Sequence, residues 1–278
     1  MGIDTIVLSG GGVKGIIFIG ALLKINKIYP LHNIETYIGT SAGSIIALML
    51  ALNYNINEIK ELLLKIDFNN ISNISSDNIF NFYNTCCLDD GQNLENIIEI
   101  IIRIKTKISK CTFRQLYNYS KKKLLINVTN LTQQKIEILD YINTPDLCVS
   151  KAIRMTCSVP FYFKPVIFNN DMYIDGSVLN NFPINYSENL DSTLGLLIRS
   201  IDNEEINSLD IFASRILNTL LQEIENLKMQ NANNTTTIIF NYNMNPLSFD
   251  IDIETKNSML KFGYDIADEF CNTNINFK

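Results

Sequence analysis

The first fifty residues alternate between apolar segments and short glycine-bearing loops, and this alternation restricts the possible folds more than any other feature. Residues 3–8 form a short β-branched apolar run that ends at a glycine-rich loop, and an apolar helix is expected over residues 13–28. Residues 35–39 repeat the strand signal, and residues 41–53 are apolar on nearly all sides, as in a buried helix. The order strand, helix, strand, helix predicts a βαβ unit and therefore a parallel sheet.

The rest of the chain continues this mixture of helices and strands. A capping-box pattern begins at Thr112 and marks the start of one helix. Further helices are predicted over residues 57–66, 94–108, 112–120, 149–156, 206–229 and 256–271, and strands over residues 124–129, 135–139, 172–174, 193–199 and 236–241. No internal repeat, linker or low-complexity segment interrupts them, so residues 1–278 are predicted to form one α/β domain.

Composition and charge exclude several classes of protein. Of the 278 residues, 46% are hydrophobic and 19% are charged, which is ample for a core. The formal net charge of −6 argues against nucleic-acid binding. One histidine and six cysteines without C-x-x-C spacing argue against a zinc site, and we expect no metal or cofactor. No signal-peptide pattern and no apolar run of ~18 residues occurs, so a cytoplasmic protein without a membrane span is expected.

Residues 39–43 read G-T-S-A-G and lie between a predicted strand and a predicted helix. This G-x-S-x-G pattern places a serine on a sharp turn, where its hydroxyl stands clear of the backbone and flanking glycines let neighbouring segments approach. The helix that follows also directs its positive end towards the serine. In this context the pattern predicts that Ser41 is a nucleophile and that Gly39 and Gly43 support its turn.

Gly10, Gly12 and Gly15 form a G-x-G-x-x-G pattern that has more than one interpretation. The preceding strand and following helix would suit a dinucleotide site, and Glu35 lies at the distance of the ribose-binding acid. That acid belongs at the end of the second strand, however, whereas Glu35 precedes the strand and the serine turn follows it. A P-loop is excluded because a glycine follows Lys14 where Ser or Thr is required. The remaining alternatives are a purely structural turn and an oxyanion hole built from backbone N–H groups.

The chain has no histidine where a serine hydrolase of the usual kind needs one. His32 is the only histidine and precedes Ser41, whereas hydrolase order places the histidine after the serine. Asp175, followed by Gly176, lies at the end of a predicted strand. From the residues alone, Asp175 is either the base that replaces histidine or an ordinary turn aspartate.

Together, these three segments resemble the patatin-like phospholipases, which combine a G-G-G-x-K-G or G-G-G-x-R-G loop, a G-x-S-x-G turn and a D-G-G or D-G-A aspartate. Residues 112–117, 128–131, 152–163 and 181–183 are also similar to that family, and the similarity runs in order from residue 6 to about residue 183. The resemblance implies a three-layer α/β/α sandwich with a mainly parallel central sheet, and a Ser-Asp dyad that uses no histidine.

The resemblance also implies a function and a set of site residues. The expected activity is a phospholipase A-type acyl hydrolase that contacts lipid surfaces peripherally and binds no nucleic acid. Ser41 and Asp175 would be its catalytic pair. The other assignments are, for the oxyanion hole, Gly10, Gly11, Gly12 and Gly15, and, for head-group binding or support of the site, Lys14, Gly39, Gly43 and Gly176.

Several alternatives stay open at this stage. Ser177 stands where the family usually has glycine or alanine, and its hydroxyl would either lower the basicity of Asp175 or have no effect. Lys14 steers a phosphate head group or extends its charge to solvent. Residues 161–163 line an acyl pocket or belong to the core, and residues 80–83 are a candidate lid. A catalytically inactive lipid-binding relative, a neutral-lipid lipase and an acyltransferase are the alternative functions.

Overall fold

The computed structural model describes residues 2–74, 78, 80, 82–199, 205–207, 209–229 and 237–273. A central sheet has the strand order β5-β6-β3-β2-β1-β7-β8, and β4 pairs with β3 beside that path. Five strands run parallel to one another, namely β1 (Thr5–Leu8), β2 (Thr36–Gly39), β3 (Lys123–Asn130), β7 (Thr193–Arg199) and β8 (Thr237–Asn241). The other three strands make antiparallel pairs, β4 (Lys135–Leu139) and β6 (Asp171–Asp175) with β3, and β5 (Val166–Phe168) with β6.

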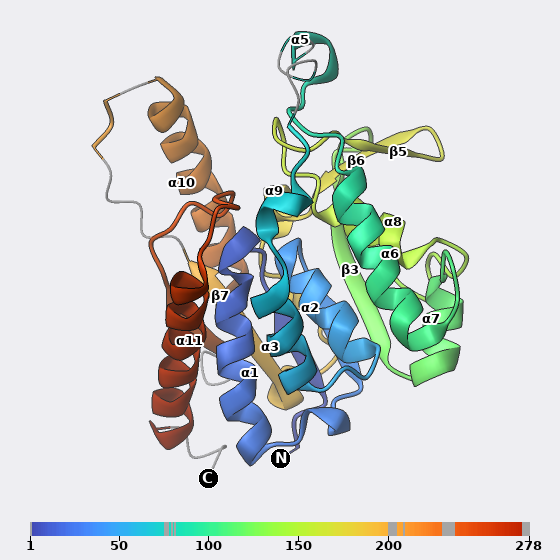
Figure 1. The fold of residues 1–278 in the computed structure, drawn as a ribbon, viewed down its shortest axis with the longest axis vertical. Coiled ribbons are helices and arrows are strands. Elements are labelled where there is room, and N and C mark those ends of the chain that lie inside the picture. Colours follow the sequence, from blue (N-terminus) through green and yellow to red (C-terminus); the bar gives the residue numbers. More distant parts are fainter. Residues whose placement is uncertain are drawn as a thin grey trace.

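Helices cover both faces of this sheet, and α1 and α11 lie side by side across one of them (Figure 1). That face carries α1 (Ile16–Ile28), α2 (Ala42–Ala51), α3 (Ile56–Lys65), α6 (Gln92–Thr106), α7 (Phe113–Ser120), α8 (Val149–Thr156) and α11 (Ile253–Thr273). The other face carries α9 (Ser177–Asn180) and α10 (Leu209–Met229), together with the short helical turns η4 (Ile184–Tyr186) and η5 (Leu190–Ser192). This arrangement confirms the predicted α/β/α sandwich with a mainly parallel sheet.

The central strand β1 shows why the sheet needs two covering layers. Successive side chains of a strand point to opposite faces. Ile6 and Leu8 accordingly belong to the large core beneath α1 and α2, whereas Val7 packs with Phe182 and Met229 on the other face. Continuous apolar strands of this kind are typical of parallel sheets that are buried on both sides.

Several elements differ in detail from the sequence predictions. The three-residue β5 was not predicted, because an apolar run of that length between Pro165 and Asn169 carries no periodicity. The helix expected over residues 206–229 begins at Leu209 in the structure, and residue 208 lies outside the described residues. The strand expected over residues 236–241 is β8, and Thr236 likewise lies outside the described part.

The register of the sheet explains why three distant segments meet at one edge. Leu8 pairs with Gly39, so the loops that follow β1 and β2 leave the sheet side by side. Strand β3 continues past Ile126, which pairs with Gly39, and the contact of the antiparallel β6 with β3 is confined to this extension. Asp175 therefore ends opposite Val128, at the edge where the serine turn begins.

None of the described helices combines the length and the apolar character that crossing a membrane requires.

Candidate active site

Ser41 stands on a tight turn between β2 and α2, with backbone angles φ 49° and ψ −127°. A residue with a side chain adopts such a positive φ only at an energetic cost, so surrounding contacts must hold the turn. One of them is close packing at Gly43, where a Cβ atom would lie 2.4 Å from the carbonyl oxygen of Ser9. Glycine is therefore required at position 43. Gly39, the last residue of β2, completes the turn.

The three segments singled out in the sequence come together at this turn. A Cβ atom built on Gly10 would lie 3.4 Å from the Cβ of Ser41 and 3.6 Å from the Cβ of Ser177. A Cβ built on Gly15 would similarly lie 3.4 Å from the Cβ of Ala42. The glycine loop is thus in contact both with the serine turn and with the segment that carries Asp175 and Gly176.

Asp175 is a buried carboxylate, 1% exposed, and its two oxygens have different surroundings. Its Oδ1 accepts the Ser177 hydroxyl at 2.7 Å and the Ser177 backbone N–H at 2.8 Å. Its Oδ2 is buried and accepts no hydrogen bond from the residues that the structure describes. One oxygen is therefore held in place, and the other is available to accept a proton.

Burial also changes the proton affinity of this carboxylate. Removal from water raises the pKa of Asp175 to about 6, because desolvation disfavours the charged form. The hydrogen bonds from Ser177 act in the opposite direction, and so does the nearby Ser41 hydroxyl. Ser41 is thus close to Asp175 even though its hydroxyl makes no hydrogen bond of standard geometry to Oδ2. At neutral pH the carboxylate is ionised but more basic than an exposed aspartate.

The Ser177 hydroxyl donates a hydrogen bond to Asp175, as the first of the two alternatives for this departure from the family pattern requires. We expect Ser177→Ala to raise the pKa of Asp175 above about 6, since a hydrogen bond that favours the charged form is lost. Loss of one such hydrogen bond changes the pKa of the accepting carboxylate by about one unit. The acid limb of the pH–rate profile should move upward by that amount, measured with a soluble ester from pH 4 to 9.

Ser177→Gly, which carries the residue usual in the family, serves as the matched variant and should show the same shift. The Ser177 N–H remains in both variants, so Asp175 stays partly held. An acid limb that stays in place, or moves to lower pH, would contradict this role for the hydroxyl.

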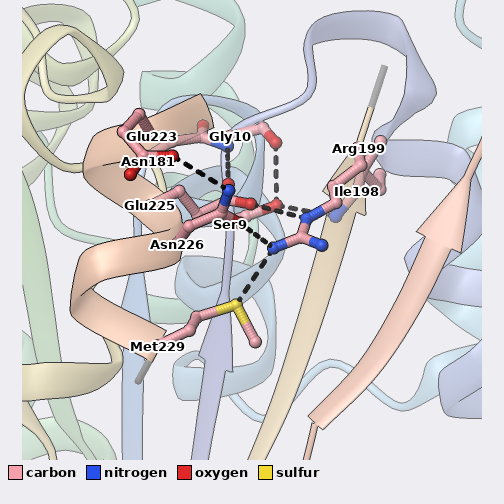
Figure 2. Close-up of polar contacts among 9 residues, drawn as sticks. All are labelled: Ser9, Gly10, Asn181, Ile198, Arg199, Glu223, Glu225, Asn226 and Met229. Atoms are coloured by element: carbon pink, nitrogen blue, oxygen red, sulfur yellow. Dashed lines mark hydrogen bonds and ion pairs between the residues drawn. The ribbon is translucent and has the colours of Figure 1, made fainter. Parts of the chain in front are cut away.

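The glycine loop is fixed at three points around Ser9 and Gly10 (Figure 2). The Ser9 hydroxyl donates to the carbonyl of Gly10 at 2.8 Å and accepts the N–H of Ile198 at 3.0 Å. The N–H of Gly10 donates to the carbonyl of Asn181 at 3.1 Å. The N–H of Gly10 is therefore already engaged, and an oxyanion hole would need other donors.

Asn181 is held in turn by a polar network on α10. Its Nδ2 lies 3.2 Å from Oε2 of the buried Glu225, whose Oε1 forms a 2.8 Å ion pair with Nε of Arg199 on β7 (Figure 2). An ion pair that is supported by additional hydrogen bonds is geometrically well defined. This network anchors the Asn181 carbonyl and, through it, the start of the glycine loop.

The second half of the loop is held by a segment near the end of the chain. The N–H of Val13 donates to the carbonyl of Pro246 at 2.9 Å. Gly12 has φ +56°, and a Cβ atom there would lie 2.0 Å from the same carbonyl oxygen. Among the described residues, nothing accepts the N–H groups of Gly11 and Gly12. These two N–H groups are therefore available as donors. Gly15 ends the short helix η1 (Gly12–Gly15), which begins at Gly12.

An apolar cavity opens beside Ser41. It encloses ≈ 660 Å³ of empty space, its opening to solvent included. Most of its walls are aliphatic and aromatic, and they include Ile16, Ile45, Leu94, Val159, Phe163 and Phe249. No charged side chain of the described residues lines it. Cys157 also reaches the wall, but burial raises the pKa of its thiol, which stays protonated. The cavity suits a hydrocarbon chain.

Three charged or titratable residues considered in the sequence do not line the cavity, namely Lys14, His32 and Glu35. Lys14 is 1% exposed, which rules out the alternative that its charge extends to solvent, and it does not line the cavity either. Burial lowers the pKa of Lys14 to about 8. His32 is exposed in the turn η2 (Leu31–Asn33), before the start of β2, and Glu35 also precedes that strand. Neither residue reaches the edge of the sheet where Ser41 lies.

Two aromatic segments were considered in the sequence, residues 161–163 for an acyl pocket and residues 80–83 for a lid. Phe163 lines the cavity, in agreement with an acyl pocket, whereas Phe161 is 65% exposed. For the candidate lid, Phe80 is also largely exposed and α5 begins at Phe82 (Phe82–Thr85), while Asn81 lies outside the described residues.

The sequence analysis missed two buried residues, Asn127 and Thr156, that connect the serine turn with the aspartate segment. The Thr156 hydroxyl accepts the N–H of Ser41 at 2.9 Å, and Nδ2 of Asn127 donates to the carbonyl of Gly176 at 3.2 Å. One signal was present: Asn127 is a polar residue that interrupts the apolar run of residues 124–128. Buried polar side chains need partners, so such a residue marks a specific contact.

The amino-acid sequence is similar to those of two viral proteins. The chain is 33% identical over 275 residues to the uncharacterized protein R571 of Acanthamoeba polyphaga mimivirus, covering 94% of this chain and 91% of that protein. It is 36% identical over 186 residues to the probable lipid hydrolase 463L of Invertebrate iridescent virus 6. That alignment covers 65% of this chain and 61% of the relative.

One solved structure has a similar fold, and one protein family matches most of the chain. The fold is similar to that of VipD from Legionella pneumophila, with a TM-score of 0.62 at 16% identity, over 99% of this chain and 67% of VipD. The family described as patatin-like phospholipase matches residues 6–187, close to the extent expected from the sequence motifs. With its glycine loop, serine turn and buried aspartate at one edge of the sheet, the chain belongs to the patatin-like phospholipase family.

Proposed function

We propose that this protein hydrolyses fatty-acyl esters of phospholipids through a Ser41–Asp175 dyad and an acyl-enzyme. One observation carries the proposal: an apolar cavity opens at Ser41, beside a buried carboxylate with one oxygen that accepts no hydrogen bond from the described part of the chain. A protein that only binds lipid would gain nothing from that oxygen, since burying it without a partner costs stability. The arrangement suits proton transfer next to a site for a hydrocarbon chain.

The chemistry follows from the positions of these groups. Asp175 Oδ2 takes the proton of Ser41 as Oγ attacks the ester carbonyl, and the N–H groups of Gly11 and Gly12 stabilise the oxyanion. Asp175 returns the proton to the departing alcohol, which leaves the acyl group on Ser41. Water then attacks this ester while Asp175 accepts its proton. Return of the proton to Ser41 releases the fatty acid.

The substrate class is inferred from the cavity and from its surroundings. The apolar walls suit the acyl chain of a lipid better than a polar substrate, and one relative is named a probable lipid hydrolase. Val159 and Phe163 line the cavity, while Phe161 between them is 65% exposed. We propose that this exposed phenylalanine, which lies in the sequence between two residues of the cavity wall, takes part in peripheral contact with a lipid surface.

The test is mass spectrometry of the products released from mixed phospholipid vesicles, with Ser41→Ala as the blank. We expect free fatty acids and lysophospholipids from the wild type only. Product formation should persist in excess EGTA, because the proposed steps use a carboxylate and backbone N–H groups instead of a metal ion.

Other outcomes of the same experiment distinguish the alternatives. Release of fatty acid from triacylglycerol droplets but not from vesicles would indicate a neutral-lipid lipase. Transfer of the acyl group to an added alcohol, without free fatty acid, would indicate an acyltransferase. Identical product spectra for the wild type and Ser41→Ala would refute the proposed function.

A further inference from the structure

The backbone N–H of Ser41 is bound by a side chain from a distant helix. The turn at Ser41 has a positive φ, and the helix that follows begins only at Ala42. The Thr156 hydroxyl, at the end of α8, accepts this N–H at 2.9 Å and donates its own hydrogen to the carbonyl of Asn127 at 2.6 Å. Both bonds are made by one hydroxyl, so its orientation is determined and the turn is tied to β3.

The side chain of Asn127 extends this connection to the aspartate segment. Its Nδ2 donates to the carbonyl of Asn180 at 2.7 Å, to the Thr40 hydroxyl at 3.0 Å and to the carbonyl of Gly176 at 3.2 Å. An amide nitrogen has two hydrogens, so three acceptors share them. Thr40 directly precedes the nucleophile and Gly176 directly follows the base.

Burial makes these contacts specific. Asn127 and Thr156 are fully buried, so water does not compete for their hydrogen bonds. Neither residue lines the cavity, and neither makes a hydrogen bond to the side chain of Ser41 or Asp175 among the described residues. They act on the backbone that carries the two reacting groups, and they leave the acyl chain untouched.

We infer that Thr156 and Asn127 are positioning residues that set the separation between Ser41 Oγ and Asp175 Oδ2. The inference rests on the proposed dyad and extends it to two residues outside the family's three motif segments. A displacement of about 1 Å between reacting groups costs roughly 10²-fold in rate. Loss of the bridge should therefore lower kcat and leave KM nearly unchanged, because the cavity wall is intact.

The test compares Thr156→Val, Thr156→Ser and Thr129→Val in the 278-residue chain on a soluble short-chain ester. Thr156→Val keeps the shape of the side chain but leaves the Ser41 N–H and the Asn127 carbonyl without their partner; a roughly 10²-fold lower kcat is expected, with KM within about twofold of the wild type. Thr156→Ser retains the hydroxyl and should restore most of kcat. Thr129→Val removes another buried β3 hydroxyl, one without a hydrogen-bond partner among the described residues, so kcat should not change.

Circular dichroism and thermal unfolding establish that each variant is folded. If Thr156→Val does not fold, Thr156→Cys takes its place, since a thiol is only a weak donor and acceptor, and the same loss in kcat is expected. A folded variant without the hydroxyl that keeps wild-type kcat would overturn the inference, and so would a Thr156→Ser protein as slow as Thr156→Val. A wild type that hydrolyses no ester would instead refute the proposed function itself, and the inference with it.

Discussion

Asp175→Asn should lower turnover by roughly 10²–10⁴, the range expected when a positioned general base is removed. Asparagine has nearly the same shape and can still accept the hydrogen bonds of Ser177, but it cannot take a proton from Ser41. The buried position of Asp175 prevents solvent from replacing it easily. Steady-state kinetics on a soluble ester, with the folded state of the variant verified by thermal unfolding, gives the measurement.

His32→Gln is the matched control and should keep wild-type turnover, because His32 is exposed and precedes β2. The pH–rate profile alone distinguishes the two residues poorly. Activity needs ionised Asp175, so the rate falls as pH falls through about 6, near the ~6.5 of an ordinary histidine. An inactive, folded His32→Gln protein beside a fully active Asp175→Asn protein would show that the dyad is assigned wrongly.

Ser41→Ala should abolish labelling by a fluorophosphonate probe, which reacts covalently with activated serine hydroxyls. Ser41 stands on a strained turn beside a buried carboxylate, and Gly12 of the glycine loop lines the same cavity. Labelling is measured by intact-protein mass spectrometry, and the modified residue is identified after proteolysis. Complete loss is expected, since the variant lacks the attacking oxygen.

Cys157 is the competing nucleophile, because it lines the same cavity as Ser41. Burial raises the pKa of its thiol, so the reactive thiolate is scarce at neutral pH. Cys157→Ala should therefore still be labelled at Ser41. Labelling that survives in Ser41→Ala and disappears only when Cys157 is also replaced would move the nucleophile to the cysteine.

Much of the fold could be predicted from local patterns. The alternation of apolar strands with helices in the first fifty residues was sufficient for a parallel sheet, and the length of those apolar runs indicated burial on both faces. What could not be predicted was the antiparallel edge. Strand β5 is three residues long, and β6 pairs with β3 only at Val128 and beyond, so its position depends on long-range register.

The candidate site was predictable to a similar degree. The motifs identified Ser41, Asp175 and the glycine loop because their turns leave local signatures. The roles of Thr156 and Pro246 depend on contacts across more than a hundred residues, which no local pattern encodes. For Lys14 the sequence indicated a charged loop residue, and only the packing shows a fully buried ammonium group.

Pro246, whose carbonyl accepts the N–H of Val13, lies outside the part of the chain that matches the family. The region shared with the family ends at residue 187, yet Pro246 fixes the loop around Gly12, and Leu247 and Phe249 form part of the cavity wall. The candidate site therefore extends beyond the region that matches the family. Chain-length preference can diverge between relatives through substitutions in this C-terminal segment while every shared motif stays intact, so matching motifs do not imply matching lipids.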